Sequence, residues 1–279
     1  MTVQINIDEE TVSSFGEEWT QFDQSELTGE EWEAMFKTYF GIFPFNNLPE
    51  GAEGFDMGCG SGRWARGVAP RVGWLNCIDP AEGALAVAQR NLAGNKNIAF
   101  HHANVSTVEL GPESQDFGYS LGVLHHIPDT SAALDACSRL LKPGAPFLLY
   151  LYYRFDNRPA WFRILWRMSE LFRSGISRLP DRLKPLATDI LATFIYWPFA
   201  RGAWLAAKLG MNPAPLPLSY YRDKSFYTMR TDSRDRFGTP LEQRFTRGEI
   251  ERMMRTAGLV EIQFSEYEPF WVAIGRKAE

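Results

Sequence analysis

Short apolar runs alternate with amphipathic segments through the middle of the chain. The apolar runs that predict strands cover residues 54–57, 74–78, 98–101, 116–121 and 147–151. Helical patterns fill the intervals at residues 62–68, 81–92 and 132–141. Because strands that alternate with helices form parallel sheets covered on both faces, the pattern predicts an α/β fold.

The same alternation returns near the end of the chain. Residues 246–257 predict a helix, and residues 260–264 and 271–274 predict two strands joined by a short connection. A connection this short suits an antiparallel hairpin rather than a crossover. We therefore expect a doubly wound, seven-stranded sheet that is mostly parallel and contains one antiparallel strand.

Two further segments differ from this core. The segment before the first strand contains a predicted helix in which Thr28 and Glu31 have the spacing of a capping box. The segment after the fifth strand, residues 152–240, holds 15 Lys and Arg against 7 Asp and Glu. The rest of the chain holds 14 Lys and Arg against 27 Asp and Glu. The predicted divisions are an N-terminal helical segment (1–50), a core (51–151), a basic, aromatic-rich helical cap (152–240) and a C-terminal part of the core (241–279).

The composition of the chain argues against several classes of protein. The net charge of −5 argues against nucleic acid as a partner. The acidic N-terminus lacks the pattern of a signal peptide, and the longest apolar run, residues 190–200, is shorter than the roughly 20 residues that cross a membrane. Cys59, Cys77 and Cys137 are too scattered for a disulfide framework or a zinc site. A cytoplasmic protein with reduced thiols is the simplest interpretation.

The strongest chemical signal is the loop Phe-Asp-Met-Gly-Cys-Gly-Ser-Gly at residues 55–62, after the first strand. Glycines there allow a ligand to approach the backbone closely, although a tight turn without a ligand would also use them. The spacing is Gly-x-Gly-x-Gly, not the Gly-x-Gly-x-x-Gly of dinucleotide sites. Asp56, two residues ahead of Gly58, suits a ligand that carries an ammonium group.

This loop resembles motif I of the class I S-adenosylmethionine-dependent methyltransferases, and four further landmarks of that family follow in order. They are Asp79-Pro80 after the second strand, Asn104-Val105 after the third, the run 119–129 on the fourth, and Leu140–Gly144 before the fifth. The resemblance covers about residues 50–151 and 245–275. It implies a Rossmann-like methyltransferase fold and an enzyme that uses S-adenosylmethionine as its cofactor.

The resemblance also implies roles for individual residues. Asp79 would accept both ribose hydroxyls, and Asn104 would meet the adenine, at a position where the family usually has Asp. Phe15, Trp19 and Phe22 would form a lid over the cofactor, as N-terminal segments do in this family, or would simply dock the segment on the core. The remaining predicted cofactor-binding residues are Asp56, Gly58, Cys59, Gly60, Pro80, Val105 and Leu121.

In such a fold the acceptor's lone pair attacks the sulfonium methyl group in line with the leaving sulfur, so positioning dominates. His125 and His126 are the candidates for a catalytic general base, because imidazole titrates near neutrality and this turn faces the methyl group in the family. Alternatively, one of them packs on the cofactor or bonds to backbone, and we favour His126 for contact with the cofactor pocket. His101 and His102 are interpreted as a feature of the sheet edge rather than a metal site.

The predicted acceptor is an oxygen or nitrogen of a small molecule, such as a sugar, a natural-product intermediate or a lipid-linked precursor. The cap has three open roles: an acceptor pocket, a homodimer interface, or a peripheral contact with an anionic membrane. The last role rests on its first helix, where Trp161, Leu165, Met168 and Phe172 lie opposite Arg163 and Arg167. Two other functions remain as alternatives: a non-catalytic cofactor-binding protein that uses the cap for a partner, and a nicotinamide-dependent oxidoreductase.

Overall fold

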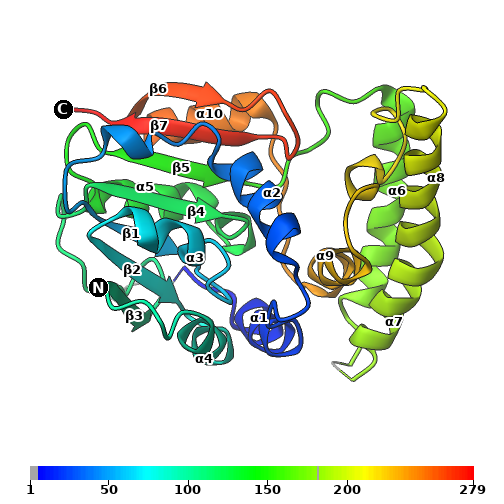
Figure 1. Cartoon of the computed structure of the whole chain (residues 1–279), viewed down its shortest axis with the longest axis horizontal. Helices are drawn as coiled ribbons and strands as arrows, with labels where there is room; N and C mark the ends of the chain where they lie inside the picture. The colour runs from blue at the N-terminus through cyan, green and yellow to red at the C-terminus, as the bar shows by residue number, and fades with distance from the viewer. Residues whose placement is uncertain (1–5, 181) are drawn as a thin grey trace. The chain divides into compact units, whose positions relative to one another are not determined.

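The computed structural model describes residues 6–180 and 182–279, and these residues form two compact units (Figure 1). The first unit contains residues 6–23, Ala34–Arg154 and Gln243–Glu279. The second unit contains Gln24–Glu33 and Phe155–Glu242. Each unit is described by itself below.

The first unit is built on one seven-stranded sheet with the strand order β3-β2-β1-β4-β5-β7-β6. Only β7 runs antiparallel, and it pairs with β5 on one side and β6 on the other. The prediction of a doubly wound, mostly parallel sheet is confirmed. The strands are β1 (Glu53–Met57), β2 (Trp74–Asp79), β3 (Ile98–His102), β4 (Phe117–Leu121), β5 (Pro146–Tyr150), β6 (Leu259–Phe264) and β7 (Val272–Lys277).

Helices cover both faces of this sheet (Figure 1). The central strand β4 is buried along its whole length, as expected for a parallel strand that has helices on both sides. The helices are α1 (Glu9–Gln21), α2 (Gly29–Phe40, of which residues 34–40 belong here), α3 (Ala65–Val68), α4 (Glu82–Asn91), α5 (Thr130–Leu140) and α10 (Arg247–Thr256). The short helices η1 (Phe45–Asn47), η2 (Ala69–Arg71) and η3 (Leu124–His126) lie between them.

Two helix starts differ from the prediction. The helix expected over residues 62–68 begins only at Ala65, because Gly62 has a φ of +76° and therefore continues the loop. The capping box expected at Thr28 is half formed. The Thr28 hydroxyl accepts from the Glu31 N–H at 3.3 Å, but the Glu31 carboxylate accepts from the Ser225 N–H and the Thr228 hydroxyl instead.

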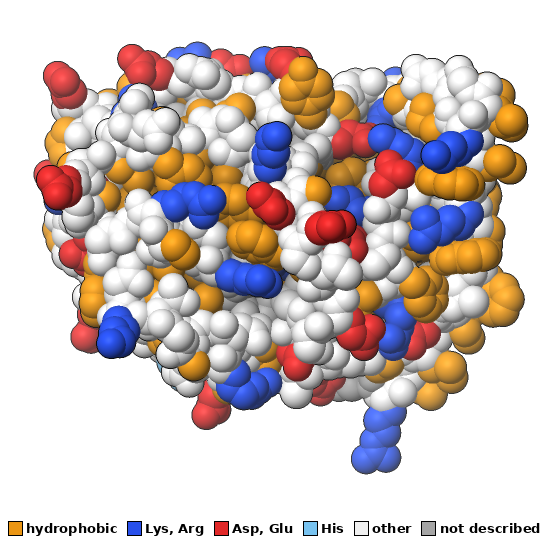
Figure 2. Space-filling view, in the orientation of Figure 1, with side chains coloured by type: hydrophobic (Ala, Val, Ile, Leu, Met, Phe, Trp, Pro, Cys, Tyr) orange, Lys and Arg blue, Asp and Glu red, His pale blue; other side chains and the backbone are white. Residues whose placement is uncertain are grey.

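The second unit is helical. It contains α6 (Ala160–Ile176), α7 (Lys184–Leu191), the π-helical turn η4 (Ala192–Tyr196), α8 (Trp197–Lys208), η5 (Ser219–Tyr221) and α9 (Phe226–Gly238). Its small apolar core consists of Tyr196, Ala200, Met229 and Phe237. Many of its large apolar side chains are instead exposed on α6 to α8 (Figure 2).

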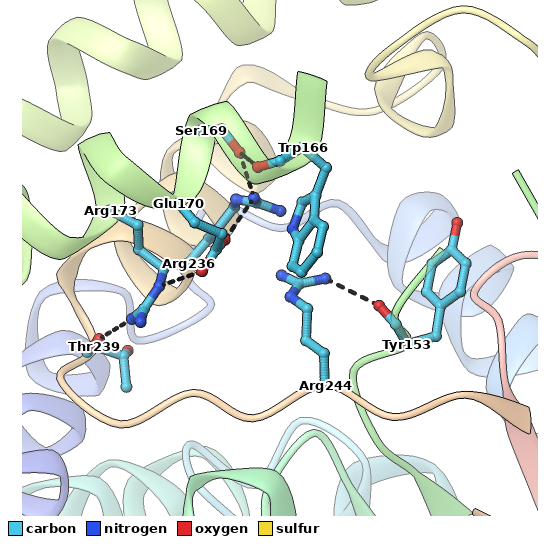
Figure 3. A network of polar contacts seen from close by, with 8 residues as sticks. All are labelled: Tyr153, Trp166, Ser169, Glu170, Arg173, Arg236, Thr239 and Arg244. Atoms are coloured by element: carbon cyan, nitrogen blue, oxygen red, sulfur yellow. Dashed lines mark hydrogen bonds and ion pairs between the residues drawn. The ribbon is translucent and has the colours of Figure 1, made fainter. Parts of the chain in front are cut away.

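Ion pairs and hydrogen bonds hold α6 and α7 to α9. Glu170 on α6 accepts from Arg173 at 2.9 Å and from Arg236 of α9 at 3.1 Å (Figure 3). Arg230 of α9 makes a bidentate pair with Asp189 of α7, with both nitrogen–oxygen distances at 2.9 Å. A bidentate pair fixes the orientation of both helices as well as their separation.

Candidate active site

The glycine loop after β1 is fastened to the neighbouring strand. The N–H groups of Gly58 and Cys59 donate to the Ile78 carbonyl at 2.8 and 3.0 Å. Gly58 has a φ of +83°, and a Cβ atom on it would lie 2.4 Å from Val123. Glycine is therefore required at position 58 both for backbone conformation and for the close approach of the loop after β4.

Asp79 joins the end of β2 to this loop. Its Oδ2 accepts from the Gly60 N–H at 2.8 Å, and its Oδ1 accepts from the Ala81 N–H at 2.9 Å. Burial raises the pKa of Asp79 to about 6, against the lowering effect of these two hydrogen bonds. Because each carboxylate oxygen has two lone pairs, each can still accept a ligand hydroxyl.

Asp56 is the most unusual polar group in the unit. It lies on β1 and is buried beside the Tyr119 hydroxyl, and neither carboxylate oxygen makes a hydrogen bond of ordinary geometry among the described residues. Burial raises the pKa of Asp56 to about 8, while the nearby Tyr119 hydroxyl lowers it and the Asp79 charge adds to the rise. A buried carboxyl group without a well-formed hydrogen bond is costly, so this site fits a ligand that brings a further donor, such as an ammonium group.

Helix α1 lies against the glycine loop. A Cβ atom on Gly60, whose φ is +52°, would lie 3.1 Å from the Trp19 indole. The guanidinium of Arg63 stands 5.1 Å from the centre of the Trp19 ring. Phe15 packs edge-on against His126 with the ring centres 4.8 Å apart, and Phe22 is buried in the core. Trp19 and Phe15 thus lie beside the predicted site, whereas Phe22 docks the segment.

The two candidate bases occupy η3 and differ in their surroundings. His125 is fully buried, and neither ring nitrogen has a hydrogen-bond partner among the described residues. Burial lowers the pKa of His125 well below its usual range, and His126 and Arg244 add to this effect. His125 is therefore a neutral imidazole at physiological pH. His126 packs beside it, with the ring centres 4.0 Å apart.

A pair of extended segments, residues 152–154 and 243–245, adjoins the histidines; we call it the stem. Phe245 N–H donates to the Tyr152 carbonyl at 2.9 Å, and Arg244 donates to the Tyr153 carbonyl at 3.4 Å (Figure 3). Gln243 N–H donates to the His125 carbonyl at 3.0 Å. The stem therefore fixes the turn that carries the histidines.

Tyr152 and Arg244 complete this region, and neither is among the residues predicted from the sequence. The Tyr152 ring lies 3.9 Å from the His125 ring, and the Arg244 guanidinium stands 5.1 Å from the Tyr152 ring. A signal existed for Tyr152, because it lies two residues after the end of β5, at the sheet edge where ligands bind in such folds. No local pattern distinguishes Arg244, whose position depends on a pairing with residues about ninety positions earlier.

The other predicted residues also lie at the carboxyl ends of strands. Asn104 Oδ1 accepts from the Ser106 N–H at 2.8 Å in a tight turn after β3. Val105 and Leu121 are buried. Cys59 is buried as well, and a hydrogen bond with Cys77, followed by burial, raises the pKa of its thiol well above the usual range. These positions agree with a common site, but the roles remain predictions.

The histidines at the end of β3 bond within the protein. His101 Nε2 lies 3.0 Å from Asn76 Oδ1, and His102 Nε2 lies 3.0 Å from the Pro80 carbonyl. Within residues 6–180 and 182–279, three or more metal-ligating side chains do not cluster anywhere.

Comparison with known proteins finds a family match for part of the chain. Residues 55–149 match a protein family described as a methyltransferase domain. The ubiquinone biosynthesis O-methyltransferase of Paracidovorax citrulli is 32% identical over 114 residues, which are 40% of this chain and 46% of that protein. The chain therefore spans less than half the length of this curated relative.

Solved structures agree on the fold. A chain in the complex between the Haloferax volcanii Trm112 methyltransferase activator and a methyltransferase is 14% identical, with a TM-score of 0.53 and coverage of 96% of this chain and 98% of that one. Phosphoethanolamine N-methyltransferase 2 of Haemonchus contortus, solved with S-adenosylhomocysteine, is 17% identical with a TM-score of 0.50. It is matched over 91% of this chain and 43% of that one.

Residues 55–149 thus belong to a methyltransferase domain, and the sheet has the Rossmann-like fold predicted for this class. The predicted class, an S-adenosylmethionine-dependent methyltransferase, is confirmed at the level of this domain.

Proposed function

We propose that the protein transfers the methyl group of S-adenosylmethionine to an oxygen or nitrogen of a small-molecule acceptor. The single observation that supports this most strongly is the buried carboxyl group of Asp56 beside the glycine loop, which makes no hydrogen bond of ordinary geometry among the described residues. The cofactor, when bound, supplies the electrophilic methyl group. The protein supplies binding, orientation and exclusion of water.

Three polar residues would hold the cofactor. Asp56 would bind its ammonium group, Asp79 its ribose hydroxyls, and Asn104 its adenine. The first contact replaces a costly buried acid with an ion pair, and the second uses lone pairs that the Gly60 and Ala81 N–H groups leave open. Trp19, which lies against the glycine loop, would cover the cofactor from solvent.

His126 is the better candidate for the proton acceptor. The low pKa of His125 makes it a weak base, and its burial and stacking on Tyr152 suit a positioning role. His126 packs between His125 and Phe15 of α1. It would take the acceptor's proton as the new bond to the methyl group forms.

The aromatic side chains of the first unit favour a flat or largely apolar acceptor. Trp64 packs on Tyr39 at 4.6 Å, Tyr39 on Tyr150 at 5.2 Å, and Tyr150 on Tyr152 at 5.9 Å between ring centres. This row ends at the stem and therefore adjoins the histidines. The name of the ubiquinone biosynthesis relative supports oxygen as the acceptor atom.

The experiment is a label-transfer assay. Purified protein is incubated with methyl-labelled S-adenosylmethionine and small-molecule extracts, and the label is followed into new compounds. We expect label in at least one small molecule with the native protein and none with Asp79→Ala. A protein that binds the cofactor tightly but labels nothing in any extract would instead support the non-catalytic alternative.

A further inference from the structure

Exposed apolar side chains are concentrated in the second unit. Among the described residues, 22 large hydrophobic side chains are exposed, and 19 of them lie within residues 155–242. The three others are Trp74, Val260 and Tyr267. Single exposed apolar residues are ordinary on proteins, but a concentration of this kind marks an interaction surface.

Helix α6 shows how this surface is built. Its apolar face, as we name it, consists of Trp161, Ile164, Leu165, Met168, Leu171 and Phe172, all exposed. Their spacing of three and four residues places them on one side of the helix. Exposed Arg163 and Arg167 lie along one edge of that side, next to Ile164 and Leu171. Ser169 and Arg173 point inward to their partners in this unit.

The chain segment after α6 also exposes large apolar side chains. Leu186, Phe194, Trp197 and Phe199 are exposed along α7, η4 and the start of α8. Figure 2 shows apolar and basic side chains next to each other over the helices of this unit. The described residues contain no helix long and apolar enough to cross a bilayer. A surface of this kind is suited to lie on a membrane rather than to span it.

The interior of this unit contains polar side chains beside its small apolar core, although many large apolar side chains stay on the surface. Helix α9 buries Thr228, Thr231, Ser233 and Arg234 against the other helices. Apolar side chains such as Leu171 and Phe172, by contrast, are about two-thirds or more exposed. Water penalises this arrangement, whereas the interface of a lipid bilayer would bury the apolar face.

The charged residues on the surface of the second unit favour an anionic partner. Exposed Arg163, Arg167, Arg178 and Lys208 accompany the apolar side chains. The described acidic residues of α6 to α8, Glu170 and Asp189, are held in ion pairs with arginines. No acidic residue occurs in the sequence between Asp189 and Asp223. A basic surface attracts anionic lipid headgroups, whereas two copies of it would repel each other.

We propose that the second unit docks on the surface of a bilayer that contains anionic phospholipids. The apolar face of α6 enters the boundary between headgroups and acyl chains, with α6 parallel to the membrane. Arg163 and Arg167 remain at the level of the headgroup phosphates. This inference does not depend on the acceptor or on the proposed catalytic residues.

Vesicle flotation of the full-length protein tests this proposal. Vesicles of phosphatidylcholine alone are compared with vesicles that contain phosphatidylglycerol as well. We expect the protein to float with the anionic vesicles, and the bound fraction to fall as salt is added. The triple variant Leu165→Ser, Met168→Ser, Phe172→Ser should bind at least tenfold more weakly to both kinds of vesicle.

Two further variants distinguish the contribution of the arginines from that of the apolar side chains, and the second unit from the first. Arg163→Glu with Arg167→Glu should remove the preference for anionic vesicles. Val260→Ser with Tyr267→Ser, which changes exposed apolar residues of the first unit, should bind like the native protein. Circular dichroism melting of each variant confirms that it is folded.

Three outcomes would overturn the proposal. The first is equal binding by the triple variant and the native protein, and the second is no binding of the native protein to either kind of vesicle. The third is a stable dimer in light scattering that the triple variant disperses, with no vesicle binding. That result would assign the apolar face to self-association instead.

Discussion

Asp79 accepts the Gly60 N–H at 2.8 Å, so the carboxylate predicted to hold the ribose also fixes the shape of the glycine loop. The same carboxylate accepts the Ala81 N–H, which precedes α4. One side chain therefore organises the two backbone segments that flank the predicted cofactor site. Its loss should affect both folding and binding.

Asp79→Ala should weaken cofactor affinity by more than tenfold and lower the free energy of unfolding by about 1 to 3 kcal/mol, since it leaves two buried N–H groups without an acceptor. Titration calorimetry and chemical denaturation measure the two effects. Asp79→Asn is the matched control, because its amide oxygen can keep one of the two bonds. Unchanged affinity in Asp79→Ala would show that the landmark is misassigned.

Asp56 should make stability depend on pH. Its pKa of about 8 in the folded protein lies above the ordinary value of 3.8, so the protonated form is favoured by folding. The resulting stability is fully present below about pH 4 and is lost as pH rises through about 8. We expect the melting temperature of the ligand-free protein to fall between pH 6 and pH 9 more steeply than that of Asp56→Asn. Parallel curves would contradict a buried, protonated Asp56.

The same group should couple cofactor binding to proton release. Near pH 7 Asp56 is largely protonated, and an ammonium group placed against it favours the carboxylate. Binding of S-adenosylhomocysteine should therefore release about one proton, seen as a binding enthalpy that changes with the ionisation enthalpy of the buffer. In Asp56→Asn this release should be nearly absent. Equal proton release by both proteins would place the ammonium group elsewhere.

Substitutions of His125 and His126 should have different effects on the catalytic rate. His126→Ala should lower kcat about 100-fold, the scale of a lost general base, while cofactor affinity stays within a few-fold of native. His125→Phe keeps a ring against Tyr152 and should retain most of the rate. Steady-state rates on the acceptor found by label transfer, with affinities from calorimetry, measure both. Full activity in His126→Ala would exclude it as the base.

Gly58→Ala should lower the free energy of unfolding more than Gly144→Ala does. The two glycines have similar φ values of +83° and +77°, so alanine strains the backbone equally at both. Only at Gly58 would the new Cβ meet a neighbour, Val123 at 2.4 Å, and nothing lies within 4 Å at Gly144. The extra crowding should cost about 1 to 3 kcal/mol of unfolding free energy. Equal losses of unfolding free energy in denaturant titrations would show that the Val123 side chain moves aside to accommodate the new Cβ atom.

Much of the first unit could be predicted from the sequence because its signals are local. Buried parallel strands can be nearly continuous apolar runs, as at 146–150, and the glycine loop requires a specific backbone wherever it occurs. The antiparallel end of the sheet followed from the short connection between β6 and β7. Such features depend on residues close together in sequence.

The missed features depend on distant residues. The stem forms only when residues 243–245 return to residues 152–154, which no local pattern indicates. Glu31 fitted a capping box by spacing, but Ser225 and Thr228 compete for its carboxylate. Trp161 and Phe172 were correctly predicted on one helix face, yet the exposure of this face could be seen only in the structure.

The central claim is that the site around Asp56, the glycine loop and Asp79 binds the methyltransferase cofactor. The most direct measurement is calorimetric titration of the purified protein with S-adenosylhomocysteine, with NAD as the control. We predict micromolar or tighter binding of S-adenosylhomocysteine at one site, and no binding of NAD. Absence of S-adenosylhomocysteine binding, or binding that survives Asp79→Ala unchanged, would contradict the account.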